Sequence, residues 1–206
     1  PAGWTIVNMD TDPFTFDRSG EAVIDLVEPE GLVLDDYSAM TYADAFDAMV
    51  EKFRTEYPFT DLKGLDWDAM SAEFRPRFEA ADEASDPDAY LLALQDFLWS
   101  IPDVHIGFGP GGAVLDNQFA EATSGGLGFA MRDIEDESGA PLGVQAFFVT
   151  PGGPAEAAGM QVGATILELG GLPVDEYVAN TIAFSAPFSV EQNARLQQLR
   201  YASRSP

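Results

Sequence analysis

The spacing of the apolar residues changes near residue 107, and this change constrains the fold more than any other feature of the sequence. Between Thr41 and Ile101 apolar side chains recur every three to four residues in three successive stripes, as on one face of a helix. From Gly107 to Gly126 glycine and proline interrupt the pattern, and short strands with one or two helices are expected beyond it. The pattern predicts an α+β fold, with a small helical bundle domain in residues 1–110 and a β-rich domain in residues 111–206.

Each of the three helical stripes has recognisable ends. Thr41 is placed to cap the first helix, and Tyr57-Pro58 stops it. The second helix is expected to begin near Asp66, and Pro76 inside it should kink or split it. The third opens at Asp86-Pro87, where the aspartate suits the N-cap and proline suits the first helical position. Three such helices are expected to bury their apolar faces against one another.

Short elements are expected before and after the bundle. Alternating residues at 4–9 and a run at 22–27 predict two leading strands, and Ser189 to Gln192 reads as a capping box for a last helix. The other expected elements of the C-terminal third are strands at Leu127–Ile134, Gly143–Thr150 and Ala164–Leu169, and a short helix at Pro154–Ala158.

Charge and composition exclude several functions. The net charge of −25 makes nucleic acid and anionic membrane surfaces unfavourable partners. No apolar run is long enough for membrane insertion. The absence of cysteine excludes disulfides, thiolate zinc sites and a cysteine nucleophile. No cluster with metal-ligand spacing stands out, so no metal and no other cofactor is expected.

A glycine-rich loop, Gly125-Gly126-Leu127-Gly128-Phe129, precedes the first strand of the C-terminal part. Glycine permits backbone turns that point several N–H groups at one spot, and such a nest suits the carboxylate of a peptide C-terminus. An extended peptide would then add as a strand beside residues 127–132. The plainer alternative is an ordinary junction between loop and strand. The peptide-binding residues predicted here are Gly126, Leu127, Gly128 and Phe129, with Val190, Ala194 and Leu196 of the last helix as the opposite wall.

Two further segments sharpen this interpretation. Val149 to Met160 contains a small-residue turn and Pro-Ala-Glu-Ala-Ala-Gly, and Gly163 to Gly171 comes after it. Together they resemble the bacterial PDZ signature, except that Ala164 stands where that family usually has aspartate. The resemblance implies a PDZ-like, partly open β-barrel in residues 111–206, truncated at its C-terminal edge, that binds the C-terminus of a polypeptide.

The segment Asp103-Val104-His105 holds the one histidine of the chain, directly after the third helical stripe. A lone histidine in this position often caps a helix end or lies half-buried in a satisfied hydrogen bond. A catalytic alternative is a general base whose ring is oriented by a nearby carboxylate. The residues alone leave both alternatives open.

The bundle segments Gly64–Trp67, Phe74–Pro76 and Tyr90–Leu94, together with Asp103-Val104-His105, resemble the leader domain of C-terminal-processing (tail-specific) and tricorn-like serine peptidases. In the tricorn-like branch this resemblance implies that His105 is the general base for a serine in a later domain, with Asp103 as its possible orienter. In the Ser-Lys branch the same histidine is not catalytic.

The sequence therefore predicts the substrate-recognition portion of an exported serine peptidase, extracellular or in the cell envelope (periplasm), with its catalytic domain absent from these residues. The expected partners are a polypeptide C-terminus and that missing domain, and the chain alone is expected to be inactive. The alternatives are a stand-alone PDZ-like adaptor or scaffold without protease activity, and an intact enzyme of another class that uses His105 with a carboxylate.

Overall fold

A computed structural model describes residues 5–9, 11–17, 35–107, 109 and 111–204. Its contacts divide the chain into two compact units, Pro1–Ala39 and Met40–Pro206. In the first unit, β1 (Ile6–Asn8) pairs with β2 (Thr15–Asp17) in an antiparallel hairpin. The strand expected at 22–27 lies outside the described residues. The predicted domain boundary near residue 110 stays a prediction.

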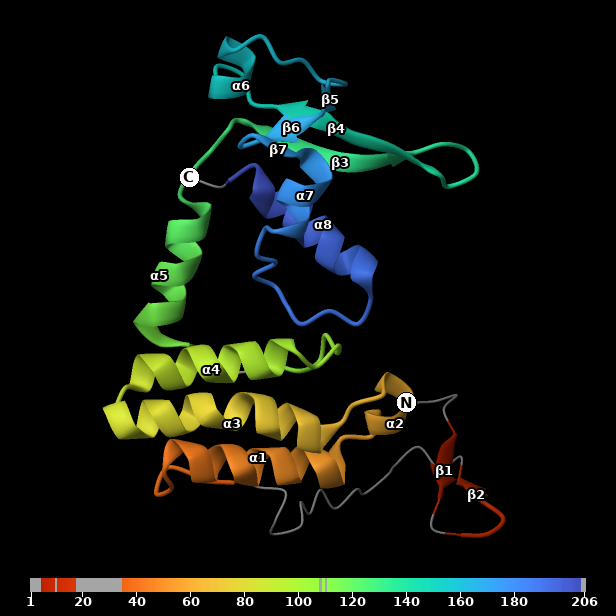
Figure 1. The fold of residues 1–206 in the computed structure, drawn as a ribbon. Helices are drawn as coiled ribbons and strands as arrows, with labels where there is room; N and C mark the ends of the chain where they lie inside the picture. The colour runs from red at the N-terminus through yellow and green to blue at the C-terminus, as the bar shows by residue number, and fades with distance from the viewer. Residues whose placement is uncertain (1–4, 10, 18–34, 108, 110, 205–206) are drawn as a thin grey trace. The chain divides into compact units, whose positions relative to one another are not determined.

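The predicted helices of the second unit are confirmed. They are α1 (Tyr42–Glu56), α3 (Trp67–Ala84) and α4 (Pro87–Trp99), with the short α2 (Thr60–Lys63) between the first two. They lie side by side, α1 against α3 and α3 against α4 (Figure 1). The side chains of Thr41 and Asp86 cap their N-termini as the sequence indicated, and the side chain of Asp66 caps α3 as well. Pro76 was expected to kink or split its helix, and the split is wrong, because α3 runs through it as one helix. The kink stays a prediction.

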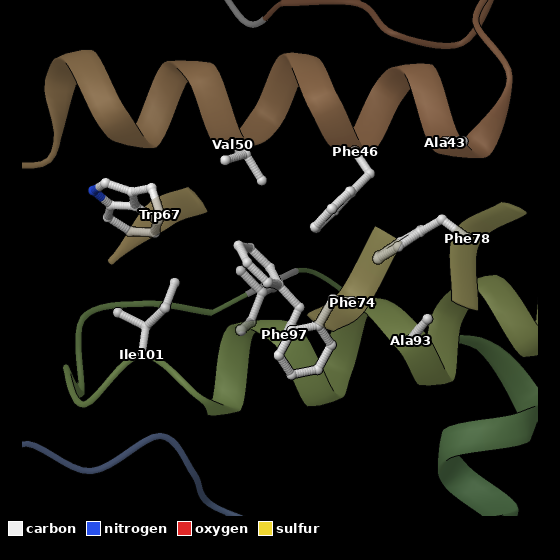
Figure 2. Close-up of a cluster of buried hydrophobic side chains, with 10 residues drawn as sticks. Ala43, Phe46, Val50, Trp67, Phe74, Phe78, Ala93, Phe97 and Ile101 are labelled. Atoms are coloured by element: carbon white, nitrogen blue, oxygen red, sulfur yellow. The ribbon is translucent and has the colours of Figure 1, made fainter. Parts of the chain in front are cut away.

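An aromatic core explains why these helices pack together. Phe46 of α1 stacks on Phe78 of α3 with ring centroids 4.2 Å apart, and the edge of Phe97 of α4 meets Phe46 at 5.0 Å. All three rings are fully buried, and Figure 2 shows them between α1 and α4. Each buried aromatic side chain removes a large apolar surface from water, so the stripes read from the sequence are the source of the bundle's stability.

One helix was missed. Residues Gly112–Thr123 form α5, although the sequence pattern had indicated only loop structure and a domain boundary between residues 107 and 126. Glycines on both sides of this segment obscured its helical character. Gly111 and Gly112 lie at its start, and Ser124 with Gly125 lies just beyond its end.

The rest of the unit combines strands and helices, which confirms a mixed α and β fold. The strands β3, β4 and β5 form an antiparallel sheet in that order, and β6 pairs with β7. These described strands form no closed sheet, so the PDZ-like barrel is not established. The elements are β3 (Phe129–Glu135), β4 (Pro141–Val149), α6 (Pro154–Ala157), β5 (Thr165–Ile166), β6 (Glu168–Leu169), β7 (Leu172–Pro173), α7 (Val174–Ala179) and α8 (Glu191–Ala202).

The predicted capping box before α8 is wrong. Val190 occupies the N-cap position of that helix, and no side chain caps it. The hydroxyl of Ser189 instead accepts a hydrogen bond from the backbone N–H of Val104, at 3.1 Å. The Ser189 hydroxyl, which the sequence pattern indicated as a cap for its own helix, thus bonds to a backbone amide 85 residues away in the sequence.

Candidate functional site

Asp103 lies just beyond α4 and is almost completely buried, with 4% of its surface exposed. Its Oδ2 accepts a hydrogen bond of 2.6 Å from the Tyr57 hydroxyl, and its Oδ1 accepts one of 3.0 Å from the His105 backbone N–H. The Tyr57 bond, and after it the His105 backbone bond, lowers the pKa of Asp103 to about 2. The carboxylate is therefore ionised at any pH at which the protein would work.

The ring of His105 is held by that carboxylate. Its Nδ1 lies 3.0 Å from Asp103 Oδ1, while 87% of the side chain is exposed. Because an ionised carboxylate only accepts, the neutral ring must donate from Nδ1–H, which leaves the lone pair of Nε2 facing outward. A general base needs this arrangement, and it differs from the half-buried, satisfied histidine of the structural alternative.

Two residues that the sequence pattern did not assign to the site support it from α1 and α2. Tyr57 is the C-cap residue directly after α1, and burial, together with its bond to Asp103, raises the pKa of its hydroxyl to about 12, so it remains a donor. Lys63, the last residue of α2, donates from Nζ to the carbonyl oxygen of Pro102. Both contacts join residues about forty positions apart in the sequence, and no local pattern announces them.

None of the three serines considered as a nucleophile, Ser100, Ser124 and Ser189, has a hydrogen bond to the His105 ring among the described contacts. The hydroxyl of Ser100 donates to the Phe97 carbonyl and that of Ser124 to the Glu121 carbonyl. Ser189 lies next to Val104, yet its hydroxyl has no hydrogen bond to the His105 ring. Nor do three His, Cys, Asp or Glu side chains come together anywhere in the described ranges to hold a metal ion.

The second feature is a groove of about 750 Å³ between β3 and α8. Four of the predicted peptide-binding residues line it, namely Gly126, Gly128, Phe129 and Leu196. The other three, Leu127, Val190 and Ala194, are not part of its lining. The groove runs along the outer edge of β3, which has a described strand partner on its β4 side alone.

The glycine nest stays a prediction, and two of its residues have contacts that bear on it. The Leu127 backbone N–H donates to the carbonyl oxygen of Ser203 at 3.1 Å, so this amide is already used within the chain. Gly128 has φ of +80°, which other residues rarely adopt, and a Cβ there would lie 2.9 Å from Pro154 Cδ. The carbonyl of Gly128 accepts a hydrogen bond from the Thr150 N–H, on the β4 side. In an antiparallel pair, backbone groups of successive residues point alternately toward and away from the partner strand, so the Phe129 N–H points away from β4, toward the open edge.

None of the described helices combines the length and the apolar character that crossing a bilayer requires. Comparison with curated proteins and with solved structures found no match. The family model of the Tricorn protease C1 domain matches residues 39–91, which cover α1, α2, α3 and the start of α4. Tyr57 and Lys63 lie inside the matched range, and Asp103 and His105 lie a short distance beyond its end. This match supports a relationship between the helical part of the chain and tricorn-like proteases.

Proposed function

We propose that this chain supplies substrate recognition and the general base of an exported serine peptidase of the tricorn-like kind. The observation that carries the proposal is the Asp103–His105 pair, in which a buried carboxylate orients an exposed imidazole. The Tricorn protease C1 match to the helices that hold this pair supports it. The serine nucleophile would lie outside the described residues.

The geometry accounts for the chemistry expected of such a base. The Nε2 lone pair of His105 would take the hydroxyl proton of the serine. At the same time the Oγ of that serine would attack the carbonyl carbon of the scissile peptide bond. The charge of Asp103 would stabilise the imidazolium that forms, and Tyr57 would keep the carboxylate in place. The imidazolium would then return the proton to the nitrogen of the leaving peptide.

The groove between β3 and α8 would hold the C-terminal end of the substrate. An extended peptide can hydrogen-bond to the open edge of β3 near Phe129, with its carboxylate at Gly126 and its side chains against Leu196. Calorimetric titration with short peptides tests this part. Peptides with a free C-terminus should bind, and their amidated counterparts should bind at least tenfold more weakly, because the carboxylate is charged and hydrogen-bonded. Equal affinity for both forms would contradict it.

Peptide hydrolysis by the protein as its gene encodes it tests the catalytic part. The variant His105→Ala should lose about three to four orders of magnitude in kcat, as expected for loss of a general base. The 206 residues alone should hydrolyse nothing, whether or not Ser189 is replaced by alanine. An unchanged kcat in the His105→Ala variant would contradict the assignment of the base.

A stand-alone adaptor is the second candidate, and the groove is the observation that favours it, because it can bind a peptide without hydrolysis. The two candidates differ in the domains that the gene must encode besides these residues. A peptidase requires a further domain with a serine and its oxyanion donors, whereas an adaptor requires none. Hydrolysis by the 206 residues alone, abolished by His105→Ala, would contradict both candidates and favour an intact enzyme of another class.

A further inference from the structure

The groove between β3 and α8 has an unusual charge for this protein. The chain holds 35 acidic residues against 10 Lys and Arg, yet the described groove lining contains two arginines and no Asp or Glu. These arginines are Arg200, in the last turn of α8, and Arg204, which lies just beyond the helix. A cationic groove in so acidic a protein indicates an anionic occupant.

The two guanidinium groups have no acidic partner among the described residues. Of the five other described arginines, Arg132 lies over the Phe147 ring and four pair with carboxylates: Arg54 with Asp68, Arg75 with Asp47, Arg77 with Asp96, and Arg195 with Asp133 and Asp175. Arg200 instead lies over the ring of Tyr201, 5.7 Å from its centroid. Carboxylates greatly outnumber arginines in this chain, so a shortage of partners does not explain why both groove arginines lack one in the described ranges.

Helix stability accounts for little of this arrangement. A cation in the last turn of a helix gains only a modest interaction with the helix dipole, and Arg200 alone occupies that turn. Arg204 lies four positions further on, and its backbone N–H donates to the Tyr201 carbonyl, which continues the turn. Like charges at this spacing repel one another. An anion bound between them would remove that repulsion.

The shape of the site identifies the anion. The groove runs beside an open strand edge and contains apolar surface from Phe129 and Leu196, which suits an extended peptide. The Leu127 amide is occupied by Ser203, so backbone amides alone give an incomplete nest for the terminal carboxylate. Two guanidinium groups match two carboxylates, and a peptide that ends in aspartate or glutamate offers both on its last residue.

We propose that Arg200 and Arg204 form an anion-binding pair that makes the groove selective for polypeptides ending in Asp or Glu. The inference rests on the proposed function of the groove as a site for peptide C-termini. It assigns to that site a substrate class and two residues that the glycine loop does not reveal.

Calorimetric titration with four peptides of one sequence tests the proposal. They end in Glu or Gln, each with a free or an amidated C-terminus. The peptide with a free C-terminal Glu should bind tightest, and either replacing Glu by Gln or amidating it should weaken binding about tenfold, as expected for loss of one charged hydrogen-bonded contact. Raising the salt concentration should weaken binding of this peptide most.

Variants connect the selectivity to the arginines. Arg200→Gln and Arg204→Gln should each reduce affinity for the free Glu peptide about tenfold, and the double variant should bind the Glu and Gln peptides alike. Arg195→Gln is the matched control, because it removes the same charge from the same helix and its side chain bonds to Asp133 and Asp175 outside the groove lining. It should leave the Glu preference intact.

The outcomes separate the two proposals. Equal affinity for the free Glu and Gln peptides, unchanged in both arginine variants, would overturn the anion-binding pair and leave the groove a site for C-termini in general. An amidated Glu peptide that binds as well as the free one would overturn the role of the terminal carboxylate. If none of the four peptides binds, the proposed function of the groove fails together with the inference.

Discussion

The helical bundle and the sheet region use their apolar residues in different ways. In the bundle the large side chains are inside, and Phe46, Phe78 and Phe97 are fully buried. In the sheet region the most buried positions hold small residues such as Ala146 and Val178. A rigid aromatic core suits a part that must hold one carboxylate and one imidazole in fixed geometry.

Some large apolar residues of the sheet region stay exposed along the groove instead. Half of the surface of Phe148 and 60% of that of Leu196 is exposed, and both line the groove. Exposed apolar surface gathered in one concave place is typical of a binding site rather than of a core. The comparison therefore teaches that apolar side chains stabilise the bundle core but remain open to solvent along the groove, as the proposed peptide site requires.

The largest expected effect tests this contrast directly. Phe97→Ala should lower the free energy of unfolding by about 3–5 kcal/mol, because it leaves a cavity in the bundle core. Phe148→Ala removes the same side chain from the groove and should cost less than about 1 kcal/mol, while weakening peptide binding. Urea denaturation of both variants provides the measurement. Similar losses of stability in the two would mean that the regions do not differ in this way.

A pair of glycines tests the backbone of the groove. Gly128→Ala should cost about 2–3 kcal/mol, because the residue has φ of +80° and the new Cβ would lie 2.9 Å from Pro154 Cδ. Gly126→Ala is the matched control, since a Cβ there meets nothing within 4 Å. Thermal unfolding should show a lower Tm for the first variant alone. A well-tolerated Gly128→Ala would mean that the loop is not held as described.

Asp103 supplies the next prediction. Asp103→Asn should lower the free energy of unfolding by about 1–2 kcal/mol at neutral pH, since the variant weakens the buried bonds from Tyr57 and His105. Because folding lowers the pKa of this carboxyl from its ordinary 3.8 to about 2, its contribution is complete above pH 4 and is lost as the pH falls toward 2. The difference between wild type and variant should shrink over that interval. A difference that stays constant from pH 7 to pH 2 would contradict the assignment.

The smallest effect concerns two hydroxyls that the sequence presented as caps. Thr41→Ala should cost about 1 kcal/mol, because the Thr41 side chain accepts from the Asp44 N–H at the start of α1. Ser189→Ala should cost less than about 0.5 kcal/mol, because that residue caps no helix. Circular dichroism during chemical denaturation measures both. Equal losses of unfolding free energy in the two variants would indicate that Ser189 caps α8, which contradicts the structure.

The parts predicted correctly from the sequence are those whose signals are local. The caps at Thr41 and Asp86 act within one helical turn, so neighbouring residues were sufficient to find them. The helix α5 was missed because glycines surround it on both sides. Local chemistry was also misleading at Ser189, where the hydroxyl serves a distant backbone amide instead of its own helix.

The candidate site was predictable only in part, because its decisive contacts join distant segments. The Asp103–His105 pair is local and was identified. Tyr57, which holds the same carboxylate, lies 46 residues earlier. The carbonyl of Ser203 accepts a hydrogen bond from the Leu127 N–H, across a long stretch of sequence. The groove arginines lie about 75 residues beyond the glycine loop that the sequence pattern indicated. No spacing rule relates such residues before the chain is folded.

The orientation of the His105 ring is the central claim, and nuclear magnetic resonance tests it most directly. His105 is the one histidine in the sequence, so a ¹⁵N-labelled chain gives a single set of imidazole signals. At a pH where the ring is neutral, long-range ¹H–¹⁵N correlations should show the proton on Nδ1 and a bare Nε2, and Asp103→Ala should shift the ring toward the other tautomer. A proton on Nε2 in the wild-type chain, or identical tautomers in chain and variant, would contradict the claim.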